Sequence, residues 1–273
     1  MSNNQPQRFK EMSLREHLRE LRKRLTVSAI AIVVGLLIAW FFYEEIFGFL
    51  RQPVDDVVAE AQDSGRDIRL VLGGVVDAFS LQIKISLVAG MLLTSPVWLL
   101  QVWRFITPGL HRKERLWSYL FVSIAAPLFA AGAYLAYSVL PFGLQILFGF
   151  TPEGVGNYVP VDRYLTFYLR MVFVFGIGFL IPLILVILNF VGLLEAKTII
   201  SKWRIVVLLV FLFSAIATPT GDPINMALLA APILFLIAVA AGIAWLNDWR
   251  RLRKGEKISF DELSDEEASP LPD

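Results

Sequence analysis

The chain has 273 residues, of which 56% are hydrophobic and 18% charged, and its mean hydropathy is +0.64. This composition excludes an ordinary soluble domain and indicates an integral membrane protein. The net charge of +1 gives no indication of a nucleic-acid partner, and the absence of cysteine excludes disulfides, thiolate metal sites and cysteine nucleophiles.

The N-terminal segment predicts a charged helix that leads into a membrane span. Residues 13–16 read SLRE, which matches a helix capping box. Leucines then recur at helical spacing and predict a packed face: Leu14, Leu18, Leu21 and Leu25. Glu20 lies off this face by helix geometry. We therefore expect an amphipathic helix from residue 13, continuous with a first span at 25–43.

Later uncharged runs predict further transmembrane helices, because most approach or exceed the roughly 20 residues that cross a bilayer. We place these spans at 80–104, 116–140, 165–194, 204–218 and 224–247. The fifth span is the shortest, and the turn sequence TPTGDP joins it to the sixth in a tight hairpin.

Prolines within the spans shape the expected bundle. Pro141 predicts that the third helix ends near Leu140. Kinks are expected at three further prolines: Pro96, Pro127 and Pro182. The predicted fold is an all-α integral membrane protein, a curved bundle of six transmembrane helices in which residues 1–247 form one membrane domain with a short final hairpin.

Cationic residues predict the orientation of the bundle. Nineteen Lys and Arg residues lie in the N-terminal segment, the connections after the second and fourth spans, and the C-terminal tail, against four in the other connections. The positive-inside rule then places both termini in the cytoplasm. Lys84 and Arg170 are expected at span ends, where long side chains can reach the interface. The tail at 248–273, basic and then acidic, is expected to be disordered.

Two glutamates stand among cations on the predicted cytoplasmic side. Glu20 lies close to several arginines, and Glu114 lies between Lys113 and Arg115. Two interpretations remain open. The carboxylates could form ordinary ion pairs with neighbouring cations on a solvated helix face. Together they could instead bind a cationic ligand, and arginine suits this best because its planar fork makes two hydrogen bonds to one carboxylate.

Missing groups argue against an enzyme. The sequence has no HExxH motif, no phosphate-binding glycine loop and no histidine inside a span to serve as a base. His17 and His111 are far apart and match no metal spacing, so no metal or other cofactor is expected. A transporter of a small solute stays an alternative because three polar residues could line a path: Lys84, Arg170 and Asp222.

Motifs between His17 and Leu246 occur in a fixed order: HLRELRKRL, PV at Pro53, DAF followed by IK at Ile83, TSP at Thr94, QVWRFITPGLHRKER, TPTGDP and AP at Ala231. In this order the chain resembles the TatC family, the core receptor subunit of the twin-arginine protein translocase. The resemblance implies that signal peptides with paired arginines on folded cargo bind at the cytoplasmic face of the cell membrane. It also implies a multimeric complex with the single-span subunits TatA and TatB, driven by the protonmotive force.

The resemblance also implies site residues. Glu20 and Glu114 match the glutamates that engage the two arginines. Four residues match the surrounding motif positions: Arg22, Phe105, Pro108 and Leu110. Outside the membrane, Pro53 matches a proline of the first loop, and Asp222 matches the aspartate of the hairpin turn, with one residue inserted.

Three positions depart from the family pattern. Polar residues that are common in the family are replaced here by Leu180 or Ile181, Met226 and Ala238. Three other polar residues are candidates for contact with the single-span partners, or for ordinary turn and cap chemistry: Thr218, Thr220 and Asn225.

Overall fold

The structure is a computed structural model that describes residues 14–106, 114–152, 155–217 and 223–253. Its residues fall into two compact units. Unit 1 comprises Met1–Ala130 and Phe148–Leu169, and unit 2 comprises Ala131–Leu147 and Arg170–Asp273. The division passes through two long helices, so each of these helices contributes one part to each unit.

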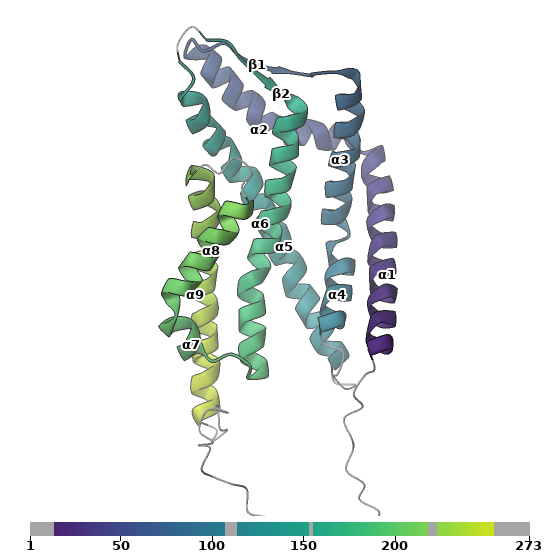
Figure 1. Ribbon diagram of the computed structural model, residues 1–273, viewed down its shortest axis with the longest axis vertical. Helices are drawn as coiled ribbons and strands as arrows, with labels where there is room; N and C mark the ends of the chain where they lie inside the picture. Colours follow the sequence, from purple (N-terminus) through teal and green to yellow (C-terminus); the bar gives the residue numbers. More distant parts are fainter. Residues whose placement is uncertain (1–13, 107–113, 153–154, 218–222, 254–273) are drawn as a thin grey trace, which may run out of the picture. The chain divides into compact units, whose positions relative to one another are not determined.

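The helices in chain order are α1 (Leu14–Phe41), α2 (Tyr43–Asp63), α3 (Val75–Leu93), α4 (Ser95–Ile106), α5 (Glu114–Gly149), α6 (Val161–Val191), α7 (Ala196–Ser201), α8 (Trp203–Ala217) and α9 (Pro223–Arg253) (Figure 1). Within the described residues, five of them, α1, α3, α5, α6 and α9, are long and apolar enough to cross a membrane, and α8 is a shorter apolar helix. The expected helical membrane fold is confirmed at this level.

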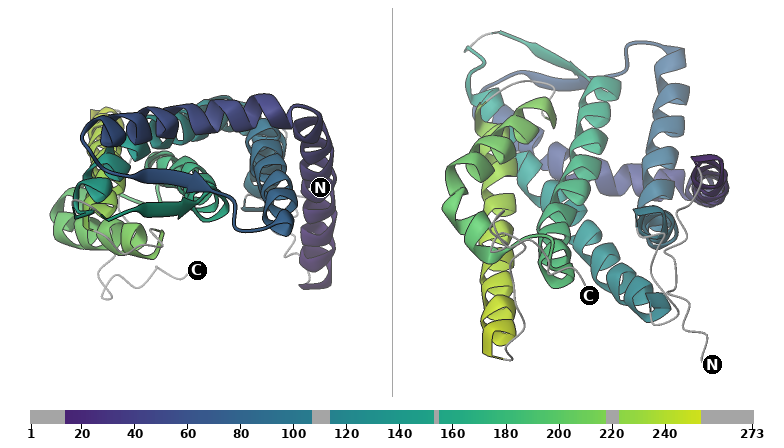
Figure 2. Two further views of the ribbon diagram at one scale, coloured as in Figure 1. Left: turned by 90° about the horizontal axis from the view of Figure 1, so that it is seen from above. Right: turned by 60° about the horizontal axis from the view of Figure 1, so that its bottom comes forward.

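In unit 1, α1 packs along α3 and also contacts α4, while α2 leaves the far end of α1 and runs crosswise to both (Figures 1 and 2). Leu50, Val54, Val57 and Ala61 make the buried face of α2 at helical spacing. This amphipathic helix occupies much of what the sequence predicted as an extracytoplasmic loop.

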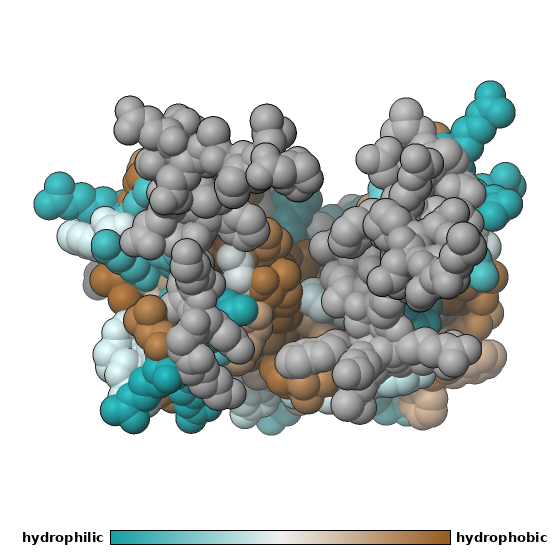
Figure 3. Space-filling view, turned by 90° about the horizontal axis from the view of Figure 1, so that it is seen from below, coloured by the Kyte–Doolittle hydropathy of each residue, from teal (hydrophilic) through white to brown (hydrophobic). Residues whose placement is uncertain are grey.

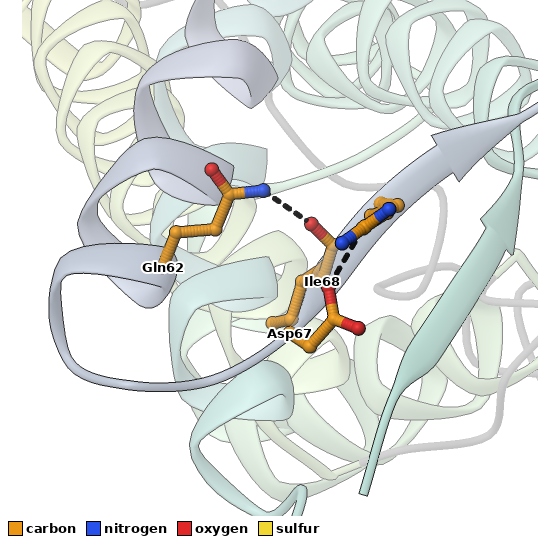
Figure 4. A network of polar contacts seen from close by, with 4 residues as sticks. Gln62, Asp67 and Ile68 are labelled. Carbon is orange, nitrogen blue, oxygen red and sulfur yellow. Dashed lines mark hydrogen bonds and ion pairs between the residues drawn. The ribbon is translucent and has the colours of Figure 1, made fainter.

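Two short strands, which we did not predict, close the same end of unit 1. β1 (Ile68–Val71) pairs in parallel with β2 (Asn157–Pro160). Gln62 Nε2 donates a 2.7 Å hydrogen bond to the Ile68 carbonyl, and Asp67 Oδ1 accepts 2.8 Å from Arg69 Nε (Figure 4). The hydrogen bond that Arg69 donates to Asp67 raises the pKa of the exposed Arg69. These contacts link α2 to the strand that follows it.

In unit 2, much of the second part of α6 is buried. A Cβ on Gly132 of α5 would lie 2.6 Å from the Phe175 carbonyl oxygen, and one on Gly178 would lie 2.7 Å from Ile233 Cδ1 on α9. Phe175 and Ile233 are fully buried. Glycines therefore let α5 and α9 approach α6 closely, as small residues do between membrane helices.

Several predicted boundaries were wrong. The third span was expected to end near Leu140, but α5 continues past Pro141 to Gly149, since a proline inside a membrane helix is tolerated where neighbouring groups compensate for the missing hydrogen bond. The break at Pro96 is confirmed, because α3 ends at Leu93 and α4 begins at Ser95. The tail was expected from 248, but α9 remains helical to Arg253.

Candidate functional site

The predicted carboxylate Glu20 belongs to the end of unit 1 where α1 begins, α4 ends and α5 starts (Figure 1). The ring of His17 on α1 stacks on Phe105 of α4, with centroids 4.8 Å apart. Trp103 on α4 stacks in turn on Phe121 of α5, with centroids 4.1 Å apart. Aromatic pairs therefore join the three helix ends.

The polar face of α1, and not its leucine stripe, is packed within unit 1. Leu18 and Leu25 are 62% and 60% exposed, whereas the side chains of Glu20 and Arg24 are only 22% and 19% exposed. The prediction of a leucine-packed face was wrong because it treated water as the solvent. In a bilayer, leucines can face lipid while polar groups turn toward the protein.

Glu20 forms an ion pair with Arg24, one helical turn later. The ordinary (i, i+4) interpretation of this carboxylate is thus realised in the structure. Arg24 Nε is buried and has no hydrogen-bond partner among the residues that the structure describes. In this half-buried position the attraction between the two charges exceeds that of a pair in bulk water.

A glycine contact between α1 and α3 sets the position of this face. A Cβ on Gly35 would lie 2.6 Å from the carbonyl oxygen of Gly90 and 2.7 Å from Cγ2 of Thr94. Any larger residue at this position would push the two backbones apart. The place of Glu20 at the end of α1 therefore depends on an interhelical contact about four turns away.

The direction of α4 is set at the break that separates it from α3. Beyond the break at Thr94, Trp98 Nε1 donates a 2.9 Å hydrogen bond back to the Met91 carbonyl. The Trp98 ring meets Phe129 of α5 edge-on, with centroids 5.3 Å apart. These contacts orient the short helix that carries Phe105 to the site.

The structure brings Glu20 and Phe105 into one cluster of helix ends but does not bring Arg22 there. Arg22 is exposed, and two residues beyond Glu20 on a helix it points to a different side. Hydrophilic side chains project outward at this end of unit 1 (Figure 3). Glu114 is the first residue of α5, and its side chain lies outside what the structure describes. Two predicted residues lie in the undescribed segment that joins α4 to α5: Pro108 and Leu110.

The remaining predicted residues lie elsewhere. Pro53 is half-buried inside α2. Asn225 on α9 is 2% exposed and lies so close to α5 that a Cβ on Gly143 would be 2.5 Å from its Oδ1. Three residues fall outside the described residues: Thr218, Thr220 and Asp222.

The three positions that depart from the family pattern lie in different surroundings. Leu180 is buried at 8% exposure, Met226 is half-buried, and Ala238 is exposed beside a groove between α8 and α9. No common site is formed by these three within the described part of unit 2.

Sequence reasoning missed a polar network in unit 2. Asn189 on α6 donates to the Leu194 carbonyl at 2.9 Å and to Asp248 Oδ1 at 2.8 Å, and it accepts from Asn247 at 2.9 Å. Asp248 Oδ2 accepts from the backbone N–H of Ala196, at the start of α7, at 2.8 Å. A lone asparagine in a long apolar run was the available signal, because such a residue needs a partner in a membrane.

Lys84 has a polar partner that the sequence did not predict. It lies well inside α3, and its Nζ donates a 3.1 Å hydrogen bond to Thr166 Oγ1 on α6. Arg170, likewise expected at a span end, lies inside α6 and is exposed. A polar partner inside unit 1 therefore accepts one of the hydrogen bonds of Lys84.

Comparison with known proteins gives one consistent result. A family model described as "Sec-independent protein translocase protein (TatC)" matches residues 16–232. A Sec-independent protein translocase protein TatC from Frankia casuarinae is 40% identical over 265 residues, which cover 95% of this chain and 73% of that protein. One of the same name from Xylanimonas cellulosilytica is 41% identical, over 91% of this chain and 89% of that protein.

A solved structure supports the same relationship. The crystal structure of the twin arginine translocase receptor TatC in DDM superposes with a TM-score of 0.71 at 34% sequence identity. The match covers 84% of this chain and 99% of that chain. The chain therefore belongs to the TatC family of Sec-independent protein translocase proteins, and it is a multi-pass membrane subunit of the twin-arginine translocase and not an enzyme.

Proposed function

We propose that the cluster of helix ends in unit 1 is where this receptor subunit binds the paired arginines of signal peptides. Glu20 carries the proposal, because its carboxylate is held half-buried on the packed face of α1, one turn from the stacked rings of His17 and Phe105. Glu114 supplies the second carboxylate from the first turn of α5. Four residues shape the surrounding surface: Arg22, Phe105, Pro108 and Leu110.

The chemistry of the carboxylates explains why arginine is required. A guanidinium presents two parallel N–H donors to one carboxylate, whereas a lysine ammonium acts as a compact point charge. A charge-assisted hydrogen bond contributes about 1.5–3 kcal/mol, and the partial exposure of Glu20 reduces this value. Two such contacts, one at each glutamate, would distinguish paired arginines from paired lysines.

Peptide binding to the purified full chain tests the proposal. A labelled signal peptide with adjacent arginines is compared with one in which both are lysine. We expect the lysine peptide to bind at least about tenfold more weakly, which corresponds to about 1.4 kcal/mol. Equal binding of the two peptides would contradict the proposal.

The topology that goes with this function has the site on the cytoplasmic side. The excess of Lys and Arg in alternate connections supports cytoplasmic termini. α8 would be the fifth of six crossings, although its 15 residues measure only about 22 Å at 1.5 Å per residue. A bilayer core of about 30 Å would then be thinned beside the turn that contains Asp222, within the curved bundle that we predicted.

Partners and driving force follow from family membership as further proposals. The subunit would assemble with several copies of the single-span subunits TatA and TatB, and the contacts would involve Thr218 and Thr220, with Pro53 and Asp222 acting on the extracytoplasmic side. Asn225, the third residue predicted for these contacts, is buried against α5 and is not part of this proposal. Because the sequence has no nucleotide-binding loop, collapse of the protonmotive force should stop transport. Transport of a small solute is set aside, since the family is one of protein translocases.

A further inference from the structure

His17 lies on α1 beside the carboxylate that is proposed to receive an arginine. Three side chains follow one another at spacings of three and four residues, His17, Glu20 and Arg24, so they form one column along the helix. Glu20 stands in the middle of this column and is paired with Arg24. The imidazole ring of His17 therefore borders the side of the Glu20 carboxylate that faces away from Arg24.

The ring of His17 forms an aromatic pair with a residue of another helix. Its centroid lies 4.8 Å from that of Phe105 on α4, and the two ring planes are inclined by 30°. This is the offset stacking that aromatic rings favour. Both residues are only half-buried, so part of the pair remains accessible to a ligand.

The pair is held in place before any ligand arrives. Phe105 lies in the last turn of α4. Two residues earlier, Trp103 stacks on Phe121 of α5, with centroids 4.1 Å apart and planes inclined by 15°. Because α4 is fixed against α5 in this way, little side-chain freedom would be lost when a ligand contacts the pair.

The Glu20 carboxylate can accept further hydrogen bonds on its ring side. Arg24 Nη2 donates to Oε1, and no other donor contacts Glu20 among the residues that the structure describes. An ionised carboxylate has about four acceptor positions on its two oxygens. A guanidinium that uses the remaining positions would lie beside the imidazole ring, since residues three apart on a helix are neighbours.

Charge alone does not distinguish arginine from lysine at this position. Glu20 attracts both, and the half-buried cations nearby, Arg24 on α1 and Arg104 on α4, repel both. A guanidinium is planar, weakly hydrated and stacks on aromatic rings, whereas an ammonium is a compact and strongly hydrated charge. An aromatic surface beside the carboxylate therefore favours arginine.

We propose that His17 is a specificity-determining residue of this receptor: with Phe105 it forms an aromatic platform on which one signal-peptide guanidinium stacks while Glu20 accepts its hydrogen bonds. The inference rests on the proposed function, because it assigns a further residue to the same site. The platform borders Glu20, so it serves one of the two arginines. Arginine is thus selected by its planar shape as well as by its charge.

Two variants of the full chain that differ in aromaticity test the platform. His17→Leu keeps an apolar side chain against Phe105 but has no aromatic face, and His17→Phe keeps a ring. Affinity for a labelled twin-arginine peptide should fall about two- to fivefold in His17→Leu, the range expected for one exposed cation–π contact. Affinity for the twin-lysine peptide should change by less than about twofold. His17→Phe should bind both peptides as wild type does.

Two mixed peptides, Arg-Lys and Lys-Arg, separate stacking from a purely structural role. Because only one arginine lies on the platform, His17→Leu should weaken one mixed peptide about two- to fivefold and leave the other within about twofold of wild type. Equal losses for the two mixed peptides, or equal losses for the twin-arginine and twin-lysine peptides, would overturn the inference. His17 would then only hold α1 against α4.

The matched control is an aromatic pair at the other end of α1. Trp40 meets Phe79 of α3 with centroids 6.3 Å apart, roughly 35 Å from His17 along the helix at 1.5 Å per residue. Phe79→Leu should therefore leave the affinities for all four peptides unchanged. Glu20→Gln separates the two levels of the account. If it leaves the preference for arginine intact, the proposed function is wrong; if it reduces that preference and His17→Leu does not, only the platform is wrong.

Discussion

Glu20 is paired within α1, which sets a condition for the proposed binding of a signal-peptide arginine. Its partner Arg24 lies one turn away, and the Nε of that guanidinium has no hydrogen-bond partner among the described residues. In the proposed site, a signal-peptide arginine would share the Glu20 carboxylate with Arg24 or displace Arg24 from it. Glu114, in the predicted second position, is the residue at which charge and reach can be varied without breaking this pair.

Substitutions at Glu114 should lower the affinity for a twin-arginine peptide by different amounts. Glu114→Gln keeps size but removes charge, and affinity should fall about tenfold for each 1.4 kcal/mol lost. Glu114→Asp keeps charge but shortens reach, so it should lie between wild type and Gln, and Glu114→Arg should be the weakest through repulsion. Titration with a fluorescent peptide measures the affinity of each variant. Glu45→Gln changes an exposed glutamate on α2 and is the control that should bind normally.

The contact between α1 and α3 should be intolerant of a side chain. Gly35→Ala would place a Cβ 2.6 Å from the Gly90 carbonyl oxygen, so the helices must separate, at a cost of about 1–3 kcal/mol. Thermal unfolding in detergent should show a lower midpoint than that of Gly48→Ala, whose new Cβ meets no atom within 4 Å. Equal midpoints for the two variants would mean that this contact does not hold α1 in place.

The polar network at the end of α6 should also stabilise unit 2 against thermal unfolding. Asp248→Ala removes the acceptor for Asn189 and for the backbone of Ala196, which leaves buried donors unpaired at about 1–3 kcal/mol. Unit 2 should therefore unfold at a lower temperature in this variant. Asp56→Ala removes an exposed carboxylate on α2 and should leave the unfolding midpoint unchanged.

The sequence predicted the helices that coincide with long apolar runs. It did not predict the structure of segments whose conformation depends on tertiary contacts. Uncharged length identified the five long spans and the short α8, and Pro96 located a real break. Strands β1 and β2 could not be foreseen, because each has only four residues and their pairing joins segments almost ninety residues apart. Asp248 was assigned to a disordered tail because its partners on α6 and α7 are distant in sequence.

The sequence selected residues of the candidate site, but it did not predict how they are arranged in space. The charge pattern and the family resemblance selected Glu20 and Phe105, and the structure gathers the helix ends that carry them through the stack of His17 on Phe105. The packed face of α1 was assigned wrongly, since periodicity alone does not tell which face meets lipid. The side chain of Glu114 lies outside the described residues, so its role stays a prediction.

The proposed membrane topology can be tested on the whole protein because the chain has no native cysteine. Ser201 on α7 and Ser64 at the end of α2 are both exposed. Ser201→Cys should react with a membrane-impermeant maleimide only when the cytoplasmic face is accessible, and Ser64→Cys only from the outside. Labelling of both variants from the same side would exclude the proposed orientation.

The most direct test of arginine recognition is a double-mutant cycle between receptor and signal peptide. The dissociation constants of a twin-arginine and a twin-lysine peptide are measured for wild type and for the Glu20→Gln, Glu114→Gln variant. If the carboxylates receive the arginines, the change to lysine should cost at least about tenfold in the wild type and almost nothing further in the variant, since the two changes remove the same contacts. If the change to lysine costs the same in both backgrounds, or if the variant binds the twin-arginine peptide as tightly as wild type does, then Glu20 and Glu114 do not form the arginine site.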